Sequence, residues 1–463
     1  MSLKTKAMLP FHLFQLDGKH YVINIEKMAA SAVDDLTAET LKRISAEPEE
    51  PLLPGLTEDL GKLELLVQDE KREFSFKEPE TFPIVSMALF VTRACNLRCT
   101  YCYEEKSGGS MEEKTAFRAV DWLLMKAGSA KQIYISFFGG EPFLNFPLIK
   151  KVAVYAREKA ARLAKEVSFN VTTNATLLND EMIQFLKEQN VRTLVSMDGP
   201  KEIQDTQRPF PDGRGSYDVV LPRVRKLLEA MPETRVHAVL VDDSKAERMK
   251  STLQDIGFPE VTLLPASASL FDKEGDGGGA KQARKLDNLL QEMEREAESW
   301  LHLFKRREKS TLKALRSGAQ LLQAMLALLH NKKMRYACGA GIKYVAVSCN
   351  GDIYLCHRFV GVDEYKLGNV FEAELRGEEY QESPLTRVPA CAACFARYYC
   401  AGGCKHDHAG SCGSAWSPSP DMCALKRREL ELASALIGRL DDQDRAFLIE
   451  SEIIPPKPCP LDF

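Results

Sequence analysis

Six short apolar segments, separated by amphipathic stretches, constrain the fold of this chain more than any other feature. They are rich in β-branched and apolar residues and occupy residues 87–92, 133–138, 167–172, 193–197, 235–241 and 261–264. The stretch after the first segment is typical of a helix, because Phe117, Val120 and Leu124 fall on one face at helical spacing. Strands that alternate with helices pair in parallel. Six repeats therefore predict an α/β fold with a partial (β/α)6 barrel of the TIM type rather than a closed eight-stranded barrel.

Four residues that could take part in ligand binding directly follow these predicted strands. They are Cys95, Gly139, Asn174 and Asp198. Ligands of parallel sheets bind at the C-terminal ends of the strands, so the sequence predicts the functional site at that edge.

Cys95, Cys99 and Cys102 are spaced C-x3-C-x2-C and so bring three thiols together on one short segment. An electron-transfer [4Fe-4S] cluster takes four cysteines, and a group of three predicts a cluster with one iron open to another ligand. A zinc knuckle is the competing interpretation, but zinc sites usually pair C-x2-C with a second C-x2-C or with two histidines. A trio of unrelated thiols is the other alternative.

The composition favours metal binding over disulfides. The 463 residues carry a net charge of −4, which gives no reason to expect a nucleic-acid partner. No N-terminal signal pattern and no apolar run of about 18 residues is present, so no membrane span is expected. We therefore expect a cytoplasmic protein, in which thiols stay reduced and 13 cysteines are better explained by metal sites than by disulfides.

A second group of cysteines lies near the C-terminus. The pattern is C-x12-G-x4-C, then C-x2-C-x5-C-x3-C, then one more cysteine, with the glycine at Gly351 and the thiols at Cys338, Cys356, Cys391, Cys394, Cys400, Cys404 and Cys423. Asn350-Gly351 between residues 345–349 and 353–358 predicts a hairpin. A zinc ribbon is the alternative, but seven interleaved thiolates suit two clusters better than one Zn²⁺. Cys349, Cys412 and Cys459 belong to neither pattern and are typical of inert apolar residues.

Both cysteine patterns resemble those of radical S-adenosylmethionine (SAM) enzymes with a SPASM extension. The resemblance implies that SAM chelates the open iron of the cluster at Cys95, Cys99 and Cys102. Gly139-Gly140-Glu141-Pro142 resembles the GGEP motif of that family, in which glycines allow close approach to the ligand and a carboxylate accepts from the SAM ammonium. The resemblance further implies SAM contacts at Tyr101, Asn174, Ser196 and Arg208.

In the family, the SPASM cysteines hold two auxiliary [4Fe-4S] clusters, giving three clusters in all. Carried over by position, four cysteines fill one auxiliary cluster: Cys391, Cys394, Cys400 and Cys423. The other receives three, namely Cys338, Cys356 and Cys404. Its fourth ligand stays open between Cys349, another residue and an iron left free for substrate.

The N-terminal region predicts a small unit of strands followed by helices. Asp17-Gly18 between residues 11–16 and 21–25 is a hairpin signal, and helical patterns follow at 37–44 and 57–66, with Pro-rich linkers at 48–54 and 78–83. The unit resembles the winged-helix-like peptide-recognition element of peptide-modifying enzymes, and a structural cap on the barrel is the alternative. A Gly-rich break at 274–279 precedes two amphipathic helices within 282–330. The predicted domains are thus recognition unit 1–80, radical SAM core 81–270, helical bridge 271–335, SPASM domain 336–430 and tail 431–463.

Cys356-His357-Arg358-Phe359-Val360-Gly361 separates subfamilies. Anaerobic sulfatase maturases carry an Asp as base after the equivalent cysteine, whereas His357 stands here. The segment is similar to thioether-forming maturases of ranthipeptides (SCIFF-type) and of the quinohemoprotein amine dehydrogenase small subunit. His357 serves either a function or a surface hydrogen bond, and His406 and His408 are expected to make surface hydrogen bonds.

This resemblance implies an enzyme that crosslinks a ribosomal precursor peptide. A 5′-deoxyadenosyl radical would abstract a side-chain hydrogen at the β-carbon of an acidic residue or a neighbour. A peptide cysteine, bound to an open auxiliary iron, would then form the thioether. The implied electron donor is a flavodoxin or a ferredoxin-type protein. The alternatives are a SPASM maturase that forms carbon-carbon bonds or formylglycine, a zinc scaffold, and an electron-relay module.

Overall fold

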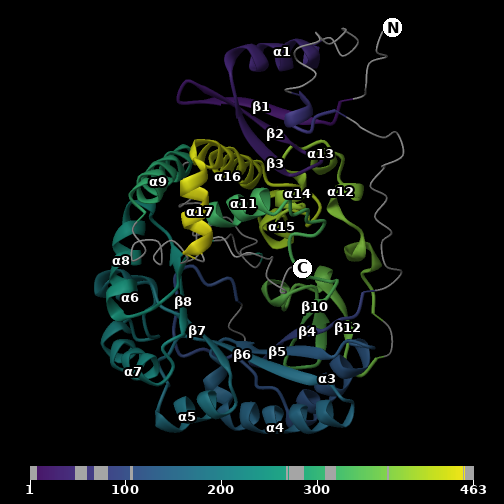
Figure 1. The fold of residues 1–463 in the computed structure, drawn as a ribbon. Coiled ribbons are helices and arrows are strands. Elements are labelled where there is room, and N and C mark those ends of the chain that lie inside the picture. The colour runs from purple at the N-terminus through teal and green to yellow at the C-terminus, as the bar shows by residue number, and fades with distance from the viewer. Residues whose placement is uncertain are drawn as a thin grey trace.

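The computed structural model describes residues 8–46, 60–66, 82–104, 108–266, 270, 286–307, 320–372, 375–451 and 453. Figure 1 shows a sheet flanked by helices at the base, a layer of helices above it and a small N-terminal sheet at the top. The predicted linker at 48–54 and the predicted Gly-rich break at 274–279 lie outside the described residues, as does Cys459. The predicted helix at 57–66 is described only from residue 60, and the predicted linker at 78–83 only from residue 82.

Six parallel strands form the base, and the predicted partial (β/α)6 barrel is confirmed. They are hydrogen-bonded in chain order. Each agrees with a predicted segment to within one residue at either end. The strands are β4 (Ser86–Thr92), β5 (Gln132–Gly139), β6 (Glu166–Thr173), β7 (Arg192–Ser196), β8 (Arg235–Leu240) and β9 (Val261–Pro265).

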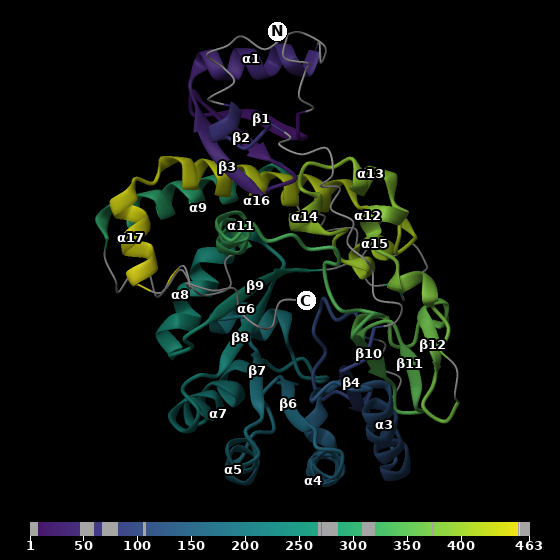
Figure 2. The ribbon, with the colours of Figure 1, turned by 45° about the vertical axis from the view of Figure 1, so that its right-hand side comes forward.

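Helices cover the outer side of these strands, as Figure 2 shows. On the first of them Val120 and Leu124 are buried against the barrel, while Phe117 stacks on Tyr155 of the next helix at 4.0 Å between ring centroids. This agrees with the predicted apolar face. The helices are α3 (Glu113–Lys126), α4 (Phe146–Arg162), α5 (Asp180–Glu188), α6 (Lys201–Gln207), α7 (Tyr217–Ala230) and α8 (Ala246–Ile256).

The sheet extends beyond the predicted six strands to nine. β10 (Tyr344–Val347) pairs in parallel with β4, and β11 (Asp352–Tyr354) and β12 (Lys366–Asn369) follow in antiparallel. The hairpin at Asn350-Gly351 is confirmed, but its second strand ends at Tyr354 rather than at residue 358, because a 3-10 turn occupies His357–Phe359. The hairpin thereby pairs the otherwise open edge of β4.

A helical layer lies over the C-terminal ends of the barrel strands. It consists of α9 (Leu286–Arg306), α11 (Gln320–Leu329), α16 (Pro420–Arg439) and α17 (Asp442–Glu450). Trp300, Phe304 and Leu436 lie in its core. The predicted domain boundary between residues 430 and 431 falls inside α16. Among the described residues, no helix has the length and apolar composition required to cross a bilayer.

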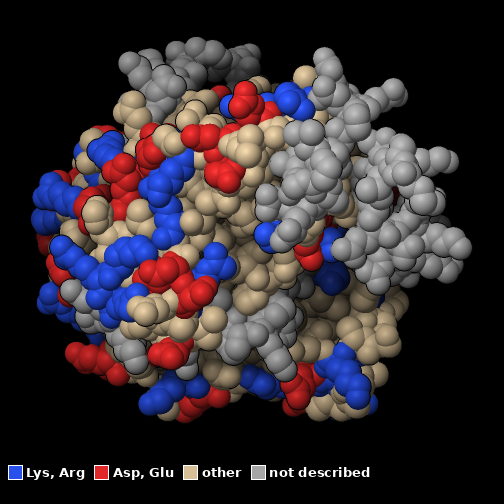
Figure 3. All heavy atoms as spheres, turned by 45° about the horizontal axis from the view of Figure 1, so that its top comes forward, with Lys and Arg blue, Asp and Glu red and all other residues tan. Residues whose placement is uncertain are grey.

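Four short helices lie among the cysteines of the second group, two of which, Cys391 and Cys400, are part of these helices. They are α12 (Pro384–Arg387), α13 (Pro389–Ala392), α14 (Arg397–Cys400) and α15 (Lys405–Cys412). Lys, Arg, Asp and Glu side chains are interspersed over the face shown in Figure 3.

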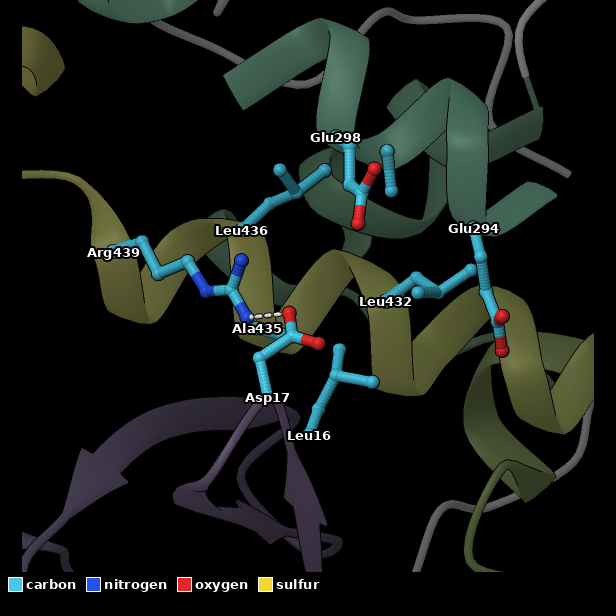
Figure 4. A pocket seen from close by; sticks show the side chains of 9 residues that line it. Leu16, Asp17, Glu294, Glu298, Leu432, Ala435, Leu436 and Arg439 are labelled. Carbon is cyan, nitrogen blue, oxygen red and sulfur yellow. Dashed lines mark hydrogen bonds and ion pairs between the residues drawn. The ribbon is translucent and has the colours of Figure 1, made fainter. Parts of the chain in front are cut away.

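The N-terminal unit is a three-stranded antiparallel sheet with a helix. β1 (Phe11–Leu16) and β2 (Lys19–Asn24) form the predicted hairpin, while β3 (Ala29–Val33) was not predicted and α1 (Asp35–Ala46) was. The sheet rests on α16, where Asp17 pairs with Arg439 (Figure 4). The Nε of Arg439 also donates to the Tyr21 hydroxyl at 3.0 Å. A cavity of only about 60 Å³ lies beside this pair, away from the cysteines.

Candidate functional site

One cavity of about 600 Å³ lies at the C-terminal ends of the barrel strands. Its volume falls in the range of small-molecule sites. All ten residues predicted to hold the first cluster or SAM line it: Cys95, Cys99, Tyr101, Cys102, Gly139, Gly140, Glu141, Asn174, Ser196 and Arg208. The structure thus brings together residues that are spread over more than 100 positions of the chain.

The loop with the first three cysteines follows β4 and is tied to the end of α6. The amide of Arg98 donates to the Pro209 carbonyl at 2.8 Å, and that of Thr100 donates to the Gln207 carbonyl at 3.0 Å. All three thiols are partly buried. In the described part of the chain, no three His, Cys, Asp or Glu side chains lie close enough to hold a single metal ion.

The glycines at the end of β5 allow the backbone there to contact the backbone that follows β4. A Cβ on Gly139, which has φ +137°, would lie 1.9 Å from the Thr92 carbonyl oxygen, and one on Gly140 would lie 2.3 Å from that of Ala94. The Glu141 amide donates to the same Ala94 oxygen at 2.9 Å. The sequence predicted that these glycines permit close approach to a ligand; in the structure they permit close approach to the segment that leads into Cys95.

Glu141 connects the ends of two neighbouring strands. Its carboxylate accepts from the Thr173 hydroxyl at 2.8 Å, the Asn174 amide at 2.8 Å and the Phe143 amide at 3.2 Å. Burial raises the pKa of Glu141 to about 7, although these hydrogen bonds act in the opposite direction. The carboxylate therefore holds β5 and β6 together and also faces the cavity.

Asp198 organises two of the predicted SAM contacts, although the sequence placed it only at a strand end. Its fully buried carboxylate accepts from the Tyr101 hydroxyl at 2.6 Å, from Arg208 Nη2 at 3.0 Å and from the Val239 amide at 2.9 Å. Burial by itself would raise the pKa of Asp198, but the charge of Arg208 and the hydrogen bonds hold it below its usual value. Arg208 therefore lines the cavity with its charge already paired.

Ser196 lies against a histidine that sequence reasoning missed. His237 Nε2 is 3.2 Å from the Ser196 hydroxyl, and burial, with a contribution from Arg208, lowers the pKa of His237 to about 4. The imidazole is thus neutral at pH 7. His237 lies within β8, where only alternation along the strand would have indicated an inward side chain.

The side-chain amide of Asn174 makes hydrogen bonds through both its nitrogen and its oxygen. Its Nδ2 donates to Asn96 Oδ1 at 3.0 Å and lies 3.9 Å from Cys95 Sγ, while its Oδ1 accepts from the Thr176 amide at 3.0 Å. The side chain consequently faces the cysteine loop as well as the cavity.

The structure places the second set of cysteines in the two groups into which the motif divides them. The pKa of Cys356 is raised to about 12, first by burial and further by the neighbouring thiolates of Cys404 and Cys338. The pKa of Cys400 is likewise raised to about 12 by burial, and the thiolates that raise it further are Cys423, Cys391 and Cys394. Cys356 is buried, Cys338 is exposed and the other five are partly buried. Thiols gathered in this way suit a metal centre that stabilises their anions.

Cys349 contacts β4. Its thiol donates to the Phe90 carbonyl at 3.1 Å, and burial raises its pKa to about 11. The charged side chains that act on it are Arg93 and Glu104. Nothing in the described residues directs Cys349 to the group of Cys338, Cys356 and Cys404.

The segment after Cys356 lines the same cavity as the residues that are predicted to contact SAM. His357 and Arg358 line it, and the His357 Nδ1 lies 2.8 Å from the Tyr344 hydroxyl. Burial lowers the pKa of His357 to about 3, so this ring is neutral.

The expectation of surface hydrogen bonds was wrong for the other two histidines, because His406 and His408 are both buried. His408 Nδ1 accepts from the Ser419 amide at 3.2 Å, so its Nε2 carries the proton that is donated to the Gly402 carbonyl at 2.6 Å. Packing of α15 against the turns around it, which is not evident from local sequence, buries both rings.

Comparison with known proteins identifies two domains. The radical SAM superfamily model matches residues 89–256, and the SPASM iron-sulfur cluster-binding domain model matches residues 338–395. An uncharacterized protein of Methanocaldococcus jannaschii is 40% identical over 131 residues, which are 28% of this chain and 44% of that protein. The serine-type anaerobic sulfatase-maturating enzyme of Bacteroides thetaiotaomicron is 26% identical over 70% of this chain and 83% of its own length.

Two solved structures share the fold. The chain anSMEcpe with bound AdoMet and Kp18Cys peptide aligns with a TM-score of 0.62 at 21% identity, covering 76% of this chain and 98% of that chain. Streptococcus suis SuiB bound to precursor peptide SuiA aligns with a TM-score of 0.51 at 17% identity, covering 89% and 98%.

An open parallel barrel with three cysteines on the loop after its first strand is the arrangement of a radical SAM domain. This chain carries a radical SAM domain followed by a SPASM domain. The pair implies a SAM-binding [4Fe-4S] cluster and auxiliary iron-sulfur clusters. The residues fit these groups, because soft thiolates suit iron-sulfur centres and the cavity size suits a ligand such as SAM.

Proposed function

We propose that this protein forms thioether crosslinks in a ribosomally made precursor peptide. The observation that carries the proposal is that a single cavity is lined both by Cys95, Cys99 and Cys102 and by the residues directly after Cys356. A substrate in this cavity would touch both a radical source and the surroundings of an auxiliary cluster. When bound, SAM and the clusters supply a 5′-deoxyadenosyl radical and an acceptor for one electron.

The side chains of the cavity would position the reactants. Glu141 and the backbone near Gly140 would accept from the SAM ammonium, Arg208 would face its carboxylate, and Asn174 and Ser196 would contact the ribose. The neutral rings of His237 and His357 would add no charge to the cavity, which Gln320 and Met422 of the helical layer also line. Exclusion of water there would protect a radical from side reactions.

The overall reaction removes two hydrogens from the peptide. One C–H hydrogen would pass to the 5′-deoxyadenosyl radical, which becomes 5′-deoxyadenosine, and one S–H hydrogen would leave as a proton and an electron while the C–S bond forms. Cleavage of SAM to methionine would consume one electron. This electron is balanced by the one that is released when the C–S bond forms. We place the carbon at the β-position of an acidic residue or a neighbour.

The N-terminal unit would recognise the peptide. Support comes from its strands and helix, which rest on α16, and from the shared fold of SuiB, whose structure holds its precursor peptide SuiA. A flavodoxin or ferredoxin-type protein would supply the electron, and two of the three [4Fe-4S] clusters would be auxiliary.

A formylglycine-forming maturase is the second candidate, because the sulfatase-maturating enzymes align over about 70% of the chain. His357 is evidence against this candidate, since those enzymes carry an Asp at the equivalent position. Conversion of Ser to formylglycine also removes two hydrogens, so mass alone does not separate the candidates. A thioether blocks alkylation of the peptide thiol, whereas formylglycine reacts with a hydrazide.

The test is an anaerobic reconstitution with iron and sulfide, followed by SAM and dithionite. We expect about 12 irons per chain and formation of 5′-deoxyadenosine. Replacement of Cys95, Cys99 or Cys102 by Ala should abolish SAM cleavage, whereas Cys412→Ala, outside the three sets, should not. Formation of 5′-deoxyadenosine above background in the first three variants would refute the assignment, and about 4 irons would refute the auxiliary clusters.

A further inference from the structure

Arg358 links the cavity to a cysteine of the second group. Its Nη1 lies 3.6 Å from Cys404 Sγ and donates to Asp407 Oδ1 at 2.9 Å. Its guanidinium lies 5.5 Å from the ring centroid of Tyr103, the residue that follows Cys102. The Arg358 side chain is 18% exposed and that of Asp407 is 21% exposed, so both charges are partly withdrawn from water.

The position of this charge has an electrostatic consequence for a metal centre. A guanidinium is always protonated, and its field is stronger in a buried site than in water. Reduction of an iron-sulfur cluster adds negative charge, and hydrogen bonds to the cluster sulfurs are among the factors that set its potential. A positive donor beside Cys404 therefore favours the reduced form, while the carboxylate of Asp407 opposes this effect.

We propose that Arg358 raises the reduction potential of the cluster held by Cys338, Cys356 and Cys404, and that Asp407 is the counter-charge that limits the increase. This inference rests on the proposed function, because it requires that these cysteines hold a cluster. The electron released when the C–S bond forms needs an acceptor near the cavity, while the accompanying proton leaves to solvent. Arg358 would make this cluster the acceptor.

The experiment is an anaerobic redox titration of the reconstituted full chain, followed by electron paramagnetic resonance. The Cys95→Ala/Cys99→Ala/Cys102→Ala background removes the signal of the SAM-binding cluster. Arg358→Met should shift one auxiliary midpoint potential to a more negative value, and Asp407→Asn should shift the same midpoint to a more positive value. The cluster at Cys391, Cys394, Cys400 and Cys423 serves as the internal control and should not move.

Arg358→Lys keeps the charge but loses the planar donor, and its midpoint should lie between the parent and Arg358→Met. Unchanged midpoints in Arg358→Met and Asp407→Asn, shifts of the same sign in both, or equal shifts of both auxiliary clusters would overturn the proposal. If Arg358→Met fails to retain iron, the sign of the Asp407→Asn shift decides. An iron content too low for auxiliary clusters in the parent would refute the proposed function instead, so the two failures are distinct.

Discussion

Asp198→Asn tests whether one buried carboxylate organises the SAM site. The side chains of Asp198 and Arg208 are 0% and 6% exposed, and their charges are joined at 3.0 Å. Loss of one partner of a buried ion pair leaves the other charge uncompensated, which costs about 3–5 kcal/mol. Asn can replace one acceptor but not the charge, so we expect a cost in this range and a loss of SAM affinity as Tyr101 and Arg208 lose their common anchor.

Asp212→Asn is the matched control, because it breaks an Arg-Asp pair of similar geometry at the surface. Asp212 and Arg214 are 53% and 77% exposed and lie 2.7 Å apart. Exposed pairs contribute about 0–1 kcal/mol. The same substitution is thus expected to have a much smaller effect outside the barrel.

The assay is hydrogen exchange of amides in β7 and β8, with SAM affinity measured by anaerobic calorimetry. Exchange reports the free energy of local opening and suits a chain of several domains, for which one global value is poorly defined. Asp198→Asn combined with Arg208→Gln should cost less than the sum of the single changes, since no charge remains unpaired. Equal effects of Asp198→Asn and Asp212→Asn, or strict additivity of the double variant, would refute the reasoning.

Three further predictions concern other parts of the molecule. Gly140→Ala places a methyl group 2.3 Å from a backbone oxygen of the cysteine loop. This substitution should lower the stability of the fold by about 1–3 kcal/mol and reduce the iron that the reconstituted protein retains. Gly61→Ala is the control, because a Cβ there has no atom within 4 Å, and it should retain iron as the parent does. The pKa of His237 is lowered to about 4 in the folded protein, so the unfolded segment binds the proton first as the pH decreases. The free energy of local opening of β8 should therefore fall by up to about 3 kcal/mol between pH 6.5 and pH 4, and His237→Gln should show a flatter pH profile of this free energy in hydrogen exchange. Glu26→Gln weakens an acceptor of Arg397 and of the Tyr398 hydroxyl, which lies 3.1 Å away. The free energy of opening of β2 and β3 should therefore fall by about 1 kcal/mol, and their amides should exchange faster. Unchanged exchange would show that other contacts hold the N-terminal unit in place.

Much of the barrel was predictable because its signals are local. Each strand is a run of apolar residues a few positions long, and its ends differ from the prediction by no more than one residue. Of the ten residues predicted to hold the first cluster or SAM, the three cysteines and the turn Gly139-Gly140-Glu141 belong to short motifs, and the resemblance to radical SAM enzymes implied the other four. Cys95, Gly139 and Asn174 follow predicted strands, which indicated that the site lies at one edge of the sheet. The hairpin at Asp17-Gly18 was predictable for the same reason, since two residues determine the turn.

Other features depend on contacts between distant segments, and no short pattern encodes them. β10 pairs with β4 across more than 250 positions, which makes the sheet nine-stranded and carries the segment after Cys356 into the cavity. β3 has little apolar alternation and is stabilised by α16 from the other end of the chain. His237 and Asp198 acquire their roles only from what surrounds them after folding.

The sequence by itself determined the six barrel strands, the helix after the first of them and the spacing of the cysteines, because backbone preference and motif spacing are properties of neighbouring residues. The tertiary structure decided which charges are paired, which rings are buried and which sites share a cavity. Those properties depend on distance and on exclusion of water, and both arise only when segments far apart in the chain pack together.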